Sequence, residues 1–119
     1  MAESEMREGG CHCGAVTYRA PAGLEQVIEC NCSHCQAKGF ILSFMPREQF
    51  ELLSGEEQLT EYQFNKKNLS HLFCSVCGVQ AFAFGTAPDG AKMAAVNIRT
   101  LNDVDPHALT PIPVDGRSF

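Results

Sequence analysis

Seven cysteines in three short clusters constrain this chain more than any other feature of its sequence. An odd number of cysteines cannot be paired completely in internal disulfides, and clustered cysteines in a reducing compartment indicate metal binding more often than bridges. Sites of several thiolates are typical of zinc. We therefore expect a fold held by metal ions, on the clusters Cys11 and Cys13, Cys30 to Cys35, and Cys74 and Cys77.

The size and charge of the chain narrow its class. At 119 residues it has the length of about one domain, and no apolar run reaches the roughly 18 residues that cross a bilayer. The acidic stretch from Met1 to Glu8 lacks the apolar core of a secretory signal. The formal charge of −5 and a single adjacent basic pair, Lys66 and Lys67, disfavour a nucleic-acid partner. We expect a cytoplasmic protein that contacts no membrane.

Short alternating segments predict strands rather than helices. Val16 and Tyr18, for example, alternate with polar residues, as a half-buried strand requires. No segment longer than about ten residues keeps a helical period. We predict a mainly β single domain of seven or eight short antiparallel strands over residues 9–119, after a flexible lead-in over residues 1–8. The expected strands are 15–20, 24–29, 40–45, 51–53, 58–64, 69–73, 79–84 and 92–98, with a helical turn at 46–50 and a polar connection at 36–39.

Two of the clusters share a detail that the third lacks. Cys13 and Cys77 are each followed directly by glycine, whereas Cys35 is followed by Gln36. A glycine after the second thiol suits a close turn whose backbone N–H groups face the sulfurs. We therefore predict one closed, fold-stabilising site of four thiolates, formed by Cys11, Cys13, Cys74 and Cys77.

Cys30, Cys32 and Cys35 then remain as three thiolates around an ion that accepts four ligands. One interpretation is a second closed site with a histidine as the fourth ligand; the candidates are His12, His34, His71 and His107. The other is an open site that keeps its fourth position for a substrate. Zinc with three thiolates is a net anion, so it acidifies water weakly and favours a soft ligand such as a thiol. That chemistry points to the activation of a thiol.

Three motifs carry a family resemblance. They read Gly-Gly-Cys-His-Cys-Gly-Ala-Val from Gly9, Cys-Asn-Cys-Ser-His-Cys from Cys30, and Phe-Cys-Ser-Val-Cys-Gly-Val-Gln from Phe73. Together they resemble the glutathione-dependent formaldehyde-activating enzyme family, to which centromere protein V is related. The resemblance implies a zinc-binding β-tent fold and an enzyme that joins glutathione and formaldehyde. That enzyme is classed as a carbon–sulfur lyase for the reverse reaction. The resemblance also implies a structural zinc on Cys11, Cys13, Cys74 and Cys77 and a catalytic zinc on Cys30, Cys32 and Cys35.

The leading hypothesis is a zinc-dependent carbon–sulfur lyase that acts on a thiol–aldehyde adduct, with glutathione as the implied thiol and formaldehyde as the implied aldehyde. The alternative is a zinc-stabilised binding module without turnover. We expect two Zn²⁺ ions, of which the second, in the open site, is only partly occupied. Nothing in the C-terminal tail assigns a role to Asp115. The phenylalanines expected to pack in the core are Phe40, Phe44, Phe82 and Phe84.

Overall fold

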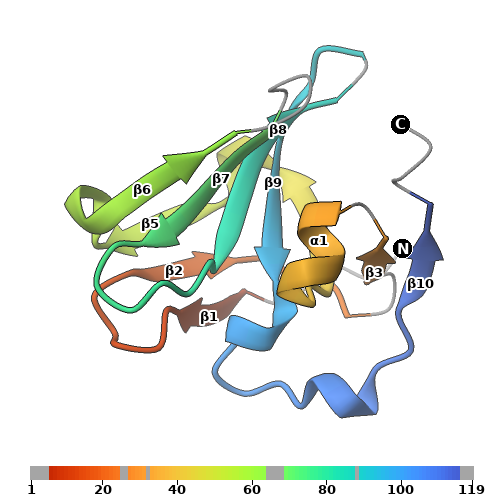
Figure 1. Ribbon diagram of the computed structural model, residues 1–119, viewed down its shortest axis with the longest axis horizontal. Helices are drawn as coiled ribbons and strands as arrows, with labels where there is room; N and C mark the ends of the chain where they lie inside the picture. Colours follow the sequence, from red (N-terminus) through yellow and green to blue (C-terminus); the bar gives the residue numbers. More distant parts are fainter. Residues whose placement is uncertain (1–5, 25–26, 32, 64–68, 88, 116–119) are drawn as a thin grey trace.

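The strands of the computed structural model form two sheets (Figure 1). The structure describes residues 6–24, 27–31, 33–63, 69–87 and 89–115. The smaller sheet has the order β1-β2-β5; its strands are β1 (Arg7–Gly10), β2 (Thr17–Ala20) and β5 (Glu51–Ser54). The larger sheet has the order β10-β3-β4-β9-β8-β7-β6; its strands are β3 (Ile28–Cys30), β4 (Leu42–Pro46), β6 (Leu59–Tyr62), β7 (Leu69–Cys74), β8 (Phe82–Thr86), β9 (Lys92–Asn97) and β10 (Ile112–Val114).

The predicted mainly β fold is confirmed, and each expected segment contains a strand. The prediction was wrong at the beginning of the chain, where β1 includes two residues of the expected lead-in. Arg7 and Glu8 pair with Ala20 and Arg19 of β2. The signal was missed because the other half of β1 is Gly9 and Gly10, which show no alternation of side chains.

The core lies between the two sheets and centres on Tyr18, which is fully buried. Its ring stacks on Phe50 at 5.5 Å and meets the edge of Phe82 at 6.1 Å between centroids. The hydroxyl group is hydrogen-bonded to Thr100 Oγ1 at 2.8 Å, which satisfies the one polar atom that this ring buries. Burial raises the pKa of Tyr18 to about 12.

Phe40 and Phe82 are buried as expected, but Phe44 is 46% exposed. In β4, Ser43 and Met45 point inward, so Phe44 between them must point outward. The continuous apolar run around this strand therefore does not mean burial on both of its faces.

The strand β10 corrects the expectation that all strands pair antiparallel. It runs parallel to β3, with Val114 opposite Cys30, and it forms the edge of the larger sheet beside β3 (Figure 1). Pro113 in its centre lacks an N–H group, which an edge strand tolerates on its outer side. The pairing uses its neighbours instead, through Ile112 N–H to Val27 O at 2.9 Å and Asn31 N–H to Val114 O at 3.0 Å.

One α-helix, α1 (Ser33–Lys38), takes the place of the expected polar connection. Six residues are too few to show a helical period, so no pattern predicted this helix. Gly39, at φ +70°, ends the helix and donates its N–H to Cys35 O at 2.9 Å. Four 3₁₀ turns complete the structure: η1 (Arg47–Gln49), as expected, η2 (Glu56–Gln58), η3 (Ile98–Thr100) and η4 (Pro106–Ala108). Within the described ranges no helix is long and apolar enough to span a bilayer.

Candidate metal centre and cavity

Four cysteines from two distant parts of the chain converge at one point. The sulfur atoms of Cys11, Cys13, Cys74 and Cys77 all lie within 4.8 Å of one another. Cys11 and Cys13 follow β1, whereas Cys74 is the last residue of β7. The structure thus brings together the four cysteines that the glycine pattern grouped, and it connects the beginning of the domain to the larger sheet.

The two cysteine pairs lie on loops of the same design. The Cys11 N–H donates to Val16 O and the Cys74 N–H to Val79 O, each at 3.0 Å. Gly14 and Gly78, the glycines after each second cysteine, have φ angles of +84° and +81°. A Cβ atom at either glycine would meet nothing within 4 Å. Glycine is therefore favoured here by the left-handed backbone and not by lack of space.

Backbone N–H groups point at these sulfurs. Val16 N–H donates to Cys11 Sγ at 3.3 Å, and Val76 N–H donates to Cys74 Sγ at 3.4 Å. The N–H of Val79 is the main cause that lowers the pKa of Cys77, to about 6. Donors of this kind favour the thiolate over the thiol.

The neighbouring thiols oppose one another's ionisation. The N–H of Ala15 lowers the pKa of Cys13, but desolvation and the three neighbouring thiols outweigh it and raise that pKa to about 11. All four groups can therefore be thiolates together only when a cation balances their charge.

The spacing of the sulfurs fits zinc. The distance is 3.6 Å from Cys11 Sγ to Cys13 Sγ and 3.7 Å from Cys13 Sγ to Cys74 Sγ. A tetrahedral ion with Zn–S bonds of about 2.3 Å separates its sulfurs by about 3.8 Å. Four thiolates within 4.8 Å of one another, two of whose separations match this spacing, could hold a metal ion and match the donor set of a structural zinc site.

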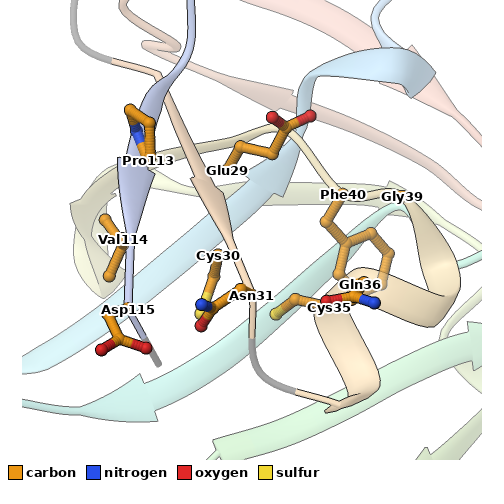
Figure 2. Close-up of a pocket in the computed structure, with 10 residues that line it drawn as sticks. All are labelled: Glu29, Cys30, Asn31, Cys35, Gln36, Gly39, Phe40, Pro113, Val114 and Asp115. Carbon is orange, nitrogen blue, oxygen red and sulfur yellow. The ribbon is translucent and has the colours of Figure 1, made fainter. Parts of the chain in front are cut away.

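The Cys30 to Cys35 stretch is arranged differently. Cys30 is the last residue of β3 and Cys35 lies in the middle of α1, where it is 7% exposed. Figure 2 shows the Cys35 side chain pointing from the helix toward the strand that carries Cys30. Cys32, the third predicted ligand, lies outside the described residues. Two members of the predicted triplet are thus placed on facing elements.

Cys30 and Cys35 line an open cavity of about 420 Å³. Its walls come from β3, α1, the turn after α1, and β10 (Figure 2); the lining residues are Glu29, Cys30, Asn31, Cys35, Gln36, Gly39, Phe40, Pro113, Val114 and Asp115. The β10 wall, including Asp115, was not predicted from the sequence. The proline-rich composition of this segment argued against a strand, although the apolar residues Ile112 and Val114 on either side of Pro113 were a weak sign of one.

No histidine lines this cavity. His12 and His107 are exposed. His34 and His71 pack against each other between α1 and the sheet, with 4.1 Å between ring centroids. His71 is also hydrogen-bonded through Nδ1 to Gln80 Nε2 at 3.1 Å. The structure therefore brings none of the four candidate histidines to the cavity with Cys30 and Cys35.

Among the histidines, His71 has the most strongly shifted pKa. It is 3% exposed, and burial is the main cause that lowers its pKa, to about 4, with the positive charges of His34 and Lys38 adding to the effect. Burial, and then Lys38, also lower the pKa of His34. The space beneath α1 therefore holds neutral imidazole rings at neutral pH.

Comparisons with known proteins agree with this architecture. A family model described as glutathione-dependent formaldehyde-activating enzyme matches residues 6–113. The crystal structure of a Rhodobacter sphaeroides protein, a Northeast Structural Genomics target, is similar with a TM-score of 0.79 and 30% sequence identity. That match covers 89% of this chain and 97% of the other. The matched residues 6–113 include all seven cysteines.

Proposed function

This chain belongs to the glutathione-dependent formaldehyde-activating enzyme family, and from that membership we propose that it joins and separates a thiol and an aldehyde. The family supports glutathione and formaldehyde as the substrates. In the joining direction, the thiolate sulfur bonds to the carbonyl carbon and the carbonyl oxygen takes up one proton. The reverse direction breaks the same C–S bond, which is a carbon–sulfur lyase reaction. No electrons are gained or lost overall, so the reaction requires no oxidant.

We assign two different tasks to the cysteines. Cys11, Cys13, Cys74 and Cys77 would hold a structural zinc that ties the loop after β1 to the end of β7. Cys30, Cys32 and Cys35 would hold a second zinc at the cavity. Bound there, zinc would supply a soft ligand position at which the pKa of a substrate thiol is lowered.

The other cavity residues would orient the substrates and exclude water. Asn31 and Gln36 present side-chain amides at the lining, and amide N–H groups stabilise the negative oxygen that forms when a thiolate adds to a carbonyl. Phe40, Pro113 and Val114 supply apolar wall, which keeps water away from the thiolate and strengthens the polar contacts beside it.

The observation that carries this proposal is the cavity lined by Cys30 and Cys35 without a histidine. A second closed site completed by a histidine would need one of the four histidines beside Cys30 and Cys35, and none of them lines this cavity. At about 420 Å³ the cavity falls in the range of small-molecule sites, roughly 300–1,000 Å³. A small thiol is therefore a fitting occupant.

Adduct exchange tests the proposal. Zinc-loaded protein is mixed with glutathione and ¹³C-labelled formaldehyde, and exchange between free and bound formaldehyde is measured by magnetisation-transfer NMR. We expect exchange well above the rate without protein, and the same low rate without protein and with the Cys35→Ser variant. As the control, the Cys35→Ser variant should keep its fold and the zinc of its four-cysteine cluster. If the native protein gave no acceleration, a binding module without turnover would describe the chain better. The cytoplasmic location and the absence of a nucleic-acid partner stay predictions from the sequence.

A further inference from the structure

A second cavity, of about 340 Å³, lies on the larger sheet away from Cys30. Its lining residues are Arg47, Gln63, Ser70, Phe84, Gly85, Thr86, Lys92 and Met93. The strand register separates the two cavities, because Met93 pairs with Pro46 whereas Asn97 pairs with Leu42, which is opposite Ile28 of β3. The four residue steps from Met93 to Asn97 span roughly 13 Å. The second cavity is therefore distinct from the proposed active site.

The charge of this cavity is opposite to that of the chain. Among the residues that the structure describes, its lining includes two cations, Arg47 and Lys92, and no aspartate or glutamate, in a protein with formal charge −5. Among the described residues, ion pairs join Arg7 to Asp103 and Arg19 to Glu51, and none involves Arg47 or Lys92. The two cations therefore face the cavity without a neutralising carboxylate from the described part of the chain.

The Arg47 guanidinium packs against two aromatic rings. It lies 3.8 Å from the centroid of the Phe84 ring and 5.8 Å from that of Phe50, and its Nη1 donates to Phe50 O at 3.5 Å. A guanidinium stacked on a ring keeps N–H groups in its own plane for an anion. Because part of its freedom is already lost, binding costs less side-chain entropy.

Two further pairs of polar groups line the cavity. Lys92 Nζ donates to Thr86 Oγ1 at 3.2 Å, and Gln63 Nε2 donates to Ser70 Oγ at 3.3 Å. Each hydroxyl oxygen accepts in its pair, which leaves the hydroxyl hydrogen able to donate to a ligand. The lining therefore combines a guanidinium, an ammonium and two hydroxyl donors.

We propose that this cavity binds a small phosphate-bearing molecule, with Arg47 and Lys92 as its cationic ligands. A tetrahedral dianion offers oxygens in several directions, which suits a planar guanidinium on one side and an ammonium and hydroxyls on another. The volume admits a small molecule, and two cations in a net acidic protein do not make the extended basic surface of a nucleic-acid binder. The site is independent of the proposed function.

Titration of the zinc-loaded protein tests this site. Glycerol 3-phosphate is added and amide shifts are followed by ¹⁵N NMR, with inorganic phosphate as a second probe and glycerol as the uncharged control. We expect saturable shifts at Gly85, Thr86 and Met93 with both phosphates and none with glycerol. Arg47→Lys keeps the charge but loses the planar fork, and Lys92→Met removes an exposed cation. Each should weaken binding roughly tenfold or more.

Arg19→Ala is the matched control, because Arg19 is a half-exposed arginine on the other sheet. Its affinity for both probes should equal that of the native protein. Equal weakening by Arg19→Ala, shifts scattered over all basic residues, or equally tight binding of succinate would each overturn the proposal. Both cavity variants change surface residues, which should leave the fold intact. Their amide spectra check this.

Discussion

The two cysteine regions of this chain differ in what surrounds the sulfur atoms. In the four-cysteine cluster, two similar loops aim backbone N–H groups at sulfurs that lie within 4.8 Å of one another. Cys30 ends a strand and Cys35 lies on a helix, and both line a cavity (Figure 2). One region has the geometry of a closed site, whereas the other leaves room for a further ligand.

The difference teaches that the backbone around the cysteines distinguishes a closed cluster of sulfurs from cysteines that line a cavity. The Cys-Gly turns at Gly14 and Gly78 close two loops tightly around their sulfurs. Cys35 is followed by helix, and its glycine comes only at Gly39, where α1 ends. The helix turns one cysteine toward a cavity instead of wrapping it in backbone.

The largest expected effect compares the loss of one cysteine from each region. Cys74→Ser should remove most of the folded population, because structural zinc contributes on the order of 10 kcal/mol to folding and this cluster joins parts of the chain 61 residues apart. Cys35→Ser should leave the fold intact and abolish adduct exchange. Circular dichroism, zinc content and NMR exchange measure these outcomes. A folded Cys74→Ser protein, or an unfolded Cys35→Ser protein, would reverse the assignment of the two regions.

Graded chelation separates the regions without mutation. Three thiolates with an exchangeable fourth ligand should lose zinc to a mild chelator well before the closed cluster does. We expect biphasic zinc release, with loss of activity in the first phase and loss of the fold in the second. Release of both ions in a single phase would indicate two equally closed sites.

Acid should destabilise the fold through the buried imidazole of His71 beneath α1. The pKa of His71 is about 4 in the folded protein against 6.5 when unfolded, so as the pH falls through 6.5 the unfolded state takes up the proton first. This group therefore costs up to about 3 kcal/mol of stability between pH 6.5 and pH 4. Comparing His71→Gln with the native protein in urea at several pH values isolates that contribution. A difference in unfolding free energy that stays constant from pH 7 to pH 4 would argue against the assignment.

The smallest effect is expected from alanine at the glycines of each region. Gly78 and Gly39 have φ angles of +81° and +70°, and a Cβ atom would meet nothing at either position. Each substitution should cost about 1–2 kcal/mol from backbone strain alone. Gly78→Ala should also weaken zinc retention in the cluster, whereas Gly39→Ala should lower adduct exchange and leave that zinc in place. Thermal unfolding and zinc release are measured for both variants. Identical results for the two would remove the distinction between the two cysteine regions.

The sequence predicted elements that depend on local pattern. Strands with alternating side chains, such as that around Tyr18, were found where expected, and the Cys-Gly detail grouped four cysteines that the structure brings together. Elements without a local signal were missed. Gly9 and Gly10 have no side chains to alternate, and α1 is shorter than two turns.

The cavity was harder to predict because it depends on a contact between distant segments. Cys30 and Cys35 could be singled out from spacing, but Val114 and Asp115 join them only through the pairing of β10 with β3. Pro113 argues against a strand unless the strand is known to lie at an edge. The position of a strand within a sheet is a tertiary property, so the sequence pattern alone could not place this wall.

The pairing of β10 with β3 has a consequence for synthesis of the protein. The four-cysteine cluster can form once Cys77 has left the ribosome, whereas the cavity wall must wait for Val114 and Asp115. That is about forty residues later, or roughly two to eight seconds at translation rates of 5–20 residues per second. During this interval Cys30 and Cys35 still lack one side of their cavity. The pairing of β10 with β3 therefore decides when that side is complete.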